Sequence, residues 1–251
     1  MTDDYAAGRE APAAALTASL RQAGAAYLDG ALANAALQPH HLLTIVRNPA
    51  VTPALLQRVG RSPVWMRQNR LRIALVLHPK TPASTALPLM SFLRWGDLAR
   101  VAVAPRLSVA VRQAAERILL LRLPELEVGE RITLARIGTP AVIKGMHRDD
   151  HPLVIRALLD NPRLQGDEVL SIAGCGDSPP AVLQAIAESS RFASRPEVQL
   201  ALASNPRTPT PVGLRVVNEL DRSGLEAVLG SPETQPLVRI AAERRLLILP
   251  P

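Results

Sequence analysis

Two histidines and two aspartates stand close together in the segment His147-Arg148-Asp149-Asp150-His151. Imidazoles and carboxylates are common metal ligands, and His147 and His151 have the spacing of two ligands on one helical turn. Pro152 follows directly, and an aspartate before proline is typical of the start of a helix. Such a start would separate the two histidines, so the sequence favours a turn and we expect no bound metal. The adjacent pair His40-His41 points in different directions and is a weaker candidate still.

Cys175, the single cysteine, lies in the segment Gly174-Cys175-Gly176-Asp177. A nucleophilic cysteine needs a base and an orienting group beside it, and no motif here supplies them. One cysteine can form neither an intramolecular disulfide nor a cysteine-ligated cluster. Glycine-rich phosphate loops, G-x-S-x-G and H-E-x-x-H are absent. We therefore interpret Cys175 as a small residue in a tight turn and expect a protein without catalytic residues or a cofactor.

Charge is the most informative chemical feature. The chain carries a net charge of +7. The excess lies in residues 58–122, called the basic sector, where twelve basic residues face two acidic ones. Such a sector favours an acidic protein or nucleic acid as partner, although a solvated surface is the plainer interpretation. Both tryptophans lie inside it and could stack on a base or anchor a partner. The candidate binding residues are Arg58, Arg61, Trp65, Arg67, Arg70, Arg72, Lys80, Arg94, Trp95 and Arg100.

The elements that position these residues are predicted by a recurring phrase, in which an apolar pair is followed after one residue by a small or polar residue and then proline. It ends at Asn48-Pro49, His78-Pro79, Ala104-Pro105, Asn161-Pro162, Asn205-Pro206 and Ser231-Pro232. Proline ends one helix, and a following Thr-Pro pair restarts the next. Period-two alternation, which strands need, is absent. The sequence thus predicts an all-α solenoid of about six or seven short two-helix repeats.

The predicted domain organisation is simple. Residues 1–15 are expected to be flexible, and residues 16–251 to form a single helical-repeat domain. A helix is expected from Pro63 to Leu77, since Ser62 is a suitable cap. Residues 123–150 and 175–196 keep only part of the phrase, so the repeat boundaries there stay open. Leu158 and Leu202, each three residues before an Asn-Pro pair, are expected to face the core.

Two segments, which end in Asn161-Pro162 and in Asn205-Pro206-Arg207-Thr208-Pro209, match the repeat of a known family most clearly. Over about residues 40–248 the chain resembles the leucine-rich repeat variant family, a relative of the HEAT and armadillo repeats. The resemblance implies a right-handed superhelix of alternating α and short 3₁₀ or α helices. Some members of that family carry an N-terminal iron–sulfur module held by cysteines. This chain has no cysteine before Cys175, so that module is not expected.

Three functions remain open from the sequence. The first is a non-catalytic protein–protein interaction scaffold with an acidic protein partner, as helical solenoids commonly are. The second is nucleic-acid binding through the basic sector, including a HEAT-like DNA-repair glycosylase with Trp95-Gly96-Asp97 near an extruded base. The third is an accessory to metal or cofactor chemistry, based on the histidines. The acidic N-terminus and the lack of a long apolar run favour a cytoplasmic protein that does not contact membranes.

Overall fold

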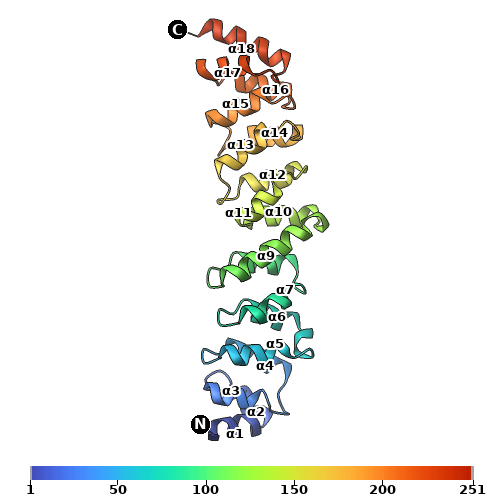
Figure 1. The fold of residues 1–251 in the computed structure, drawn as a ribbon, viewed down its shortest axis with the longest axis vertical. Helices are drawn as coiled ribbons and strands as arrows, with labels where there is room; N and C mark the ends of the chain where they lie inside the picture. Colours follow the sequence, from blue (N-terminus) through green and yellow to red (C-terminus); the bar gives the residue numbers. More distant parts are fainter. Residues whose placement is uncertain (1, 250–251) are drawn as a thin grey trace. The chain divides into compact units, whose positions relative to one another are not determined.

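The structure, a computed structural model, describes residues 2–249, and these residues form helices and turns without a strand (Figure 1). The chain divides into two compact units, Met1–Arg122 and Leu123–Pro251. The helices of the first unit are α1 (Thr2–Glu10), α2 (Ala13–Ser19), α3 (Ala25–Ala31), α4 (Pro39–Arg47), α5 (Pro53–Arg61), the 3₁₀ helix η1 (Trp65–Arg67), α6 (Asn69–Val76), α7 (Ala83–Met90), α8 (Trp95–Ala102) and α9 (Val109–Arg122). Those of the second unit are the 3₁₀ helix η2 (Leu123–Glu125), α10 (Val128–Ile137), α11 (Pro140–Met146), α12 (Pro152–Leu159), α13 (Gly166–Gly174), α14 (Pro180–Ala187), α15 (Pro196–Ser204), α16 (Thr210–Val217), α17 (Arg222–Gly230) and α18 (Pro236–Ile248).

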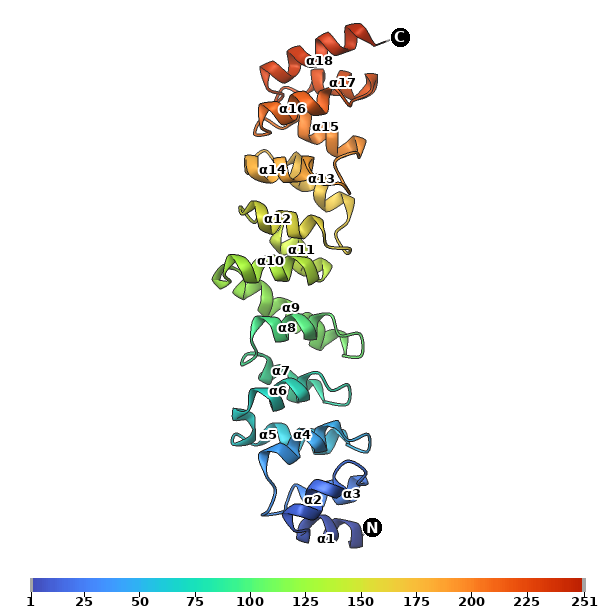
Figure 2. The same ribbon diagram turned by 180° about the vertical axis from the view of Figure 1, so that it is seen from behind.

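The second unit repeats the first. Four turns begin at Asn34, Asn48, His78 and Ala104, and four more at Asn161, Cys175, Asn205 and Ser231, so intervals of 14, 30 and 26 residues recur in the same order. Each residue therefore has an equivalent 127 positions later, as Asn34 has in Asn161. The helices follow the same rule, since α4, α7 and α9 begin 127 residues before α13, α16 and α18. In Figure 2 the helices of each unit follow one another in chain order.

All eight turns are closed in the same way. The backbone N–H of the fourth residue donates to the carbonyl of the first, as Val51 does to Asn48 and Ser178 does to Cys175. The residue three positions before each turn is buried, and at most 2% of its surface is exposed. Leu158 and Leu202 are two of these residues, which confirms their expected burial. The turn and its apolar anchor are thus the unit of sequence that repeats.

Buried asparagines join four of these turns to the C-terminal end of an earlier helix in the same unit. The amide nitrogen of Asn48 donates to the carbonyls of Leu20 and Ala23 at 2.7 and 3.1 Å, and its oxygen accepts from the Ala50 N–H at 2.6 Å. Asn34, Asn161 and Asn205 make the same three kinds of bond. These bonds satisfy carbonyls that a helix end leaves free, which is costly if they are buried and unpaired.

Basic side chains replace or reinforce this link at other turns. His78 cannot bridge as asparagine does, but its Nδ1 accepts from the Lys80 N–H at 3.1 Å. The Lys80 ammonium then donates to the carbonyls of Pro49 and Val51 at 2.8 and 3.1 Å. Arg122 similarly donates to the carbonyls of Leu93 and Ser91. Part of the positive charge of the basic sector therefore stabilises the fold.

Several details differ from the sequence-based expectations. Residues 2–10, expected to be flexible, form α1, which packs against α3. The expected helix from Pro63 to Leu77 is interrupted, because η1 ends at Arg67 and α6 begins at Asn69. The sequence pattern of residues 123–150 and 175–196, where the repeat boundaries were left open, is that of their equivalents in the first unit.

Candidate partner-binding surface

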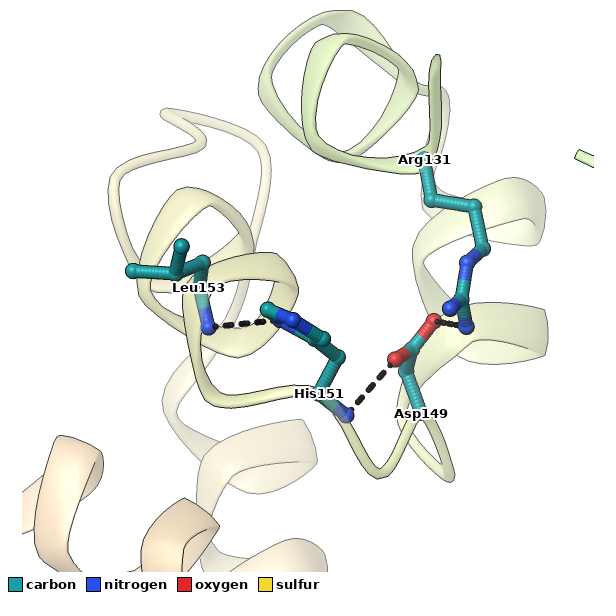
Figure 3. Close-up of polar contacts among 4 residues, drawn as sticks. All are labelled: Arg131, Asp149, His151 and Leu153. Carbon is teal, nitrogen blue, oxygen red and sulfur yellow. Dashed lines mark hydrogen bonds and ion pairs between the residues drawn. The ribbon is translucent and has the colours of Figure 1, made fainter. Parts of the chain in front are cut away.

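Two side chains of the histidine–aspartate segment, those of Asp149 and His151, are bonded within the fold (Figure 3). Asp149, whose side chain is 3% exposed, accepts from the guanidinium of Arg131 at 2.6 Å and from the His151 N–H at 2.9 Å. His151 caps α12, because its Nδ1 accepts from the Leu153 N–H at 3.3 Å. Within residues 2–249, no group of three histidine, cysteine, aspartate or glutamate residues is placed to hold a metal ion.

Cys175 is exposed and follows the last residue of α13. It lines a cavity of about 310 Å³ together with His147, Arg148, Ser171 and Asp177. Its equivalent in the first unit is Asn48, whose side chain bridges to the C-terminal end of α2. The thiol makes no such bridge among the bonds of the described residues, so the cavity lies where the second unit lacks one asparagine link.

The described helices are too short and too polar for any one of them to cross a lipid bilayer.

Apart from Arg100, which is described below, the basic candidates and two further arginines of the basic sector fall into two groups. In the first group the charge is already paired or covered: Arg58 pairs with Asp29, and Lys80 bonds to two carbonyls. Arg72 is half-buried, and its guanidinium lies 5.5 Å from the ring centroid of Phe92. In the second group are Arg61, Arg67, Arg70 and Arg94, with Arg106 and Arg117; all are exposed, and none forms an ion pair with a residue that the structure describes.

Arg70 and Arg100 lie together at a groove of the first unit, and Arg47 joins them. Arg47 ends α4, Arg70 lies in the first turn of α6, and Arg100 lies in the last turn of α8. The groove has a volume of about 570 Å³; it is also lined by His78-Pro79 and by five aliphatic residues that we call its floor, namely Leu43, Val46, Ile73, Ala74 and Leu77. We call it the arginine groove.

The charge of the arginine groove comes from its guanidinium groups. Burial, and next the positive charge of Lys80, lower the pKa of His78, which disfavours its charged form. No acidic residue lines the groove. Arg100 has a carboxylate nearby, since its guanidinium lies 3.7 Å from Asp97, but the arginine side chain remains 63% exposed. An exposed pair at this distance leaves the arginine available to a ligand.

The two tryptophans lie elsewhere in the first unit. Trp65 begins η1 and Trp95 begins α8, and both are half-buried. Neither lines the arginine groove. The structure therefore brings Arg70 and Arg100 together but places both aromatic candidates outside the groove.

The second unit has the same positions without the arginines. The equivalents of Arg47, Arg70 and Arg100 are Gly174, Glu197 and Ala227. The aliphatic floor is retained in part: Leu170, Leu200 and Ala201 are equivalent to Leu43, Ile73 and Ala74, whereas Val46 and Leu77 correspond to Ala173 and Ser204. The three arginines are consequently not required by the fold at these positions.

Arg47 was missed from the sequence because it lies before residue 58, where the charge excess begins. The signal that could have found it is its position at the end of a helix, one residue before an Asn-Pro turn. The residues just before the turns at Cys175 and Asn205 are Gly174, which is the equivalent of Arg47, and Ser204.

No family model, curated protein or solved structure matches this chain.

Proposed function

We propose that this chain is a non-catalytic interaction scaffold whose first unit binds an acidic protein. The carrying observation is an inversion of charge at four equivalent exposed positions. Arg61, Arg70, Arg94 and Arg106 of the first unit correspond to Glu188, Glu197, Asp221 and Glu233 of the second. Because the same helices and turns accept either sign, the fold does not explain the arginines, whereas an acidic partner does.

The architecture supports this role. Each unit is a series of short helices joined by one repeated turn. The chain resembles the leucine-rich repeat variant family, whose members are built in the same way. We propose that the repeats form a right-handed solenoid, whose rigid surface holds the arginines at fixed spacing. Small-angle X-ray scattering that fits a globule better than an extended particle would contradict the solenoid.

A binding measurement with a defined probe tests the function. Fluorescence anisotropy of a labelled polyglutamate peptide should show binding that weakens as salt is raised from about 50 to 200 mM. Binding should be abolished by Arg61→Glu, Arg70→Glu, Arg94→Asp and Arg106→Glu together, which place in the first unit the residues that the second unit has. A matched control reverses four exposed basic residues of the second unit: Arg136, Lys144, Arg148 and Arg244.

The outcomes separate the alternatives. If both variants lose binding equally, only the net charge matters and the first unit has no binding surface of its own. If single-stranded DNA of equal charge binds the wild type more tightly than polyglutamate at both salt concentrations, the nucleic-acid function replaces this one. The tryptophans outside the groove give that alternative less support, because bases bind by stacking on aromatic side chains.

A further inference from the structure

The arginine groove combines two chemistries in one place. Leu43, Ile73 and Leu77 are only half-buried, so their side chains leave apolar surface open to solvent. Arg47, Arg70 and Arg100 are exposed around them. Water contact with the aliphatic floor is unfavourable, and burial by a ligand would relieve it. The groove therefore suits a ligand that has both apolar groups and negative charge.

We propose that the arginine groove binds a short segment of an acidic protein in which aliphatic side chains lie between carboxylates. The guanidinium fork matches a carboxylate with two parallel hydrogen bonds, which gives each arginine a defined partner. Aliphatic side chains of the same segment cover the floor formed by Leu43, Ile73 and Leu77. This inference rests on the proposed function and adds to it the place and the kind of ligand.

The lining favours a polypeptide over the other anionic ligands. A nucleic acid would bring phosphates to the arginines but finds no phenylalanine, tyrosine or tryptophan in the groove for its bases. A second copy of this chain would offer its second unit, where basic and acidic residues nearly balance at fourteen and sixteen. A separate acidic segment complements the first unit, with fifteen basic and six acidic residues, far better.

The duplicated fold supplies a reciprocal test in the full chain. The loss variant carries Arg47→Gly, Arg70→Glu and Arg100→Ala, which are the residues of the second unit at these positions. The gain variant adds Gly174→Arg, Glu197→Arg and Ala227→Arg to the loss variant. All three receiving positions are exposed, and a Cβ atom at Gly174 meets no other atom within 4 Å. Circular dichroism and thermal unfolding check that both variants keep the fold.

The probe is a fluorescein-labelled peptide, roughly ten residues long, that alternates glutamate with leucine. The loss variant should bind it at least about tenfold more weakly than the wild type, since charge-assisted hydrogen bonds of this kind are lost. The gain variant should recover part of the affinity, since it regains the three arginines but has Ser204 where the floor of the groove has Leu77. A peptide that alternates glutamate with serine should bind the wild type about tenfold more weakly, because it cannot cover the floor.

Each other result overturns the proposal in a distinct way. If polyglutamate binds but the loss variant keeps full affinity for the leucine peptide, the first unit binds acidic proteins elsewhere and only the groove is wrong. If the serine peptide binds as tightly as the leucine peptide, the floor plays no part. If light scattering shows that the wild type is a dimer and the loss variant is a monomer, a second copy of the chain occupies the groove. If no acidic polypeptide binds the wild type, the proposed function itself fails.

Discussion

The first and second units have the same order of helices and turns. Their equivalent residues are similar in the core and differ at the surface. Leu56 and Leu183 are equivalent and fully buried, and so are Leu98 and Leu225. At the surface, by contrast, arginine is replaced by acid at four equivalent positions. Core residues that are the same in both units are those that the fold needs. Surface residues that differ between the units are free to serve a function specific to one unit.

One ion pair illustrates such a difference. In the first unit Asp29 of α3 pairs with Arg58 of α5. In the second unit Arg156, the equivalent of Asp29, pairs with Glu188 at 2.6 Å, which follows α14. The charge at this position is reversed, and its partner shifts by three residues, since Glu188 is the equivalent of Arg61 and not of Arg58. Exposed pairs of this kind contribute little to stability, so either sign is tolerated.

The largest expected effect concerns the shared core. Leu75 and Leu202 are equivalent, and both are 0% exposed. Replacing either with alanine should lower the free energy of unfolding by about 2–5 kcal/mol, because each leaves a cavity beside a turn. Urea unfolding followed by circular dichroism measures both. A large loss at one position with none at the other would contradict the equivalence of the units.

The asparagine bridges should be nearly as important. Asn161→Ala removes two bonds to carbonyls at the end of α10 and one from the Arg163 N–H. Leaving these buried groups unpaired should cost about 2–3 kcal/mol. Asn218→Ala is the control, since Asn218 is exposed and bonds only within its own helix end. Equal losses in the two variants would show that the bridge has no special role.

A stabilising change should be possible at Cys175. Cys175→Asn places at this turn the residue that its equivalent Asn48 provides, and the new amide can bridge to the carbonyls of His147 and Asp150. The melting temperature should rise by an amount that corresponds to about 1 kcal/mol. Cys175→Ser serves as the matched control, because serine is too short to bridge. A fall in stability with asparagine but not with serine would contradict the equivalence of the turns.

The smallest expected effect is the contribution of one histidine of the first unit to the pH dependence of stability. His41 Nδ1 accepts from the Gln38 N–H at 3.0 Å, as Glu168 accepts from Gln165 in the second unit. Burial, and then the charge of His40, lower the pKa of His41. As the pH falls below about 6.5, the unfolded chain takes up the proton first, so the free energy of unfolding should decrease until the lower folded pKa is passed.

His41→Gln keeps an acceptor at this position and should remove the share of this decrease that His41 causes. Urea unfolding at several pH values between about 4 and 7 measures it. An unchanged pH profile in the variant would show that His41 is not the titrating group.

The all-α class could be predicted from the sequence, because recurring prolines and capping residues indicate where helices end and begin. The sequence was also sufficient for Leu158 and Leu202, whose burial follows from their distance to an Asn-Pro turn. It concealed the duplication, because proline is missing after Asn34 and Cys175, so that two of the eight turns lack the visible mark. Comparing the chain with itself at a shift of 127 residues would have revealed both.

The candidate site was only partly predictable. Local charge density pointed to Arg70 and Arg100 but could not separate them from Lys80, whose ammonium bonds to carbonyls about thirty residues earlier in the chain. That distinction depends on which turns are neighbours in space. For the same reason Arg47 stayed outside the predicted set, since α4 and α6 meet only in the folded unit.

The most direct test of the account compares the two units within one protein. Hydrogen–deuterium exchange of the full chain is measured with and without the peptide that alternates glutamate with leucine. We expect slower exchange in α4, α6 and α8 of the first unit, and no change in their equivalents α13, α15 and α17. Equally slow exchange in both units, or slower exchange in the second unit alone, would contradict the claim that the first unit binds acidic partners through its arginines.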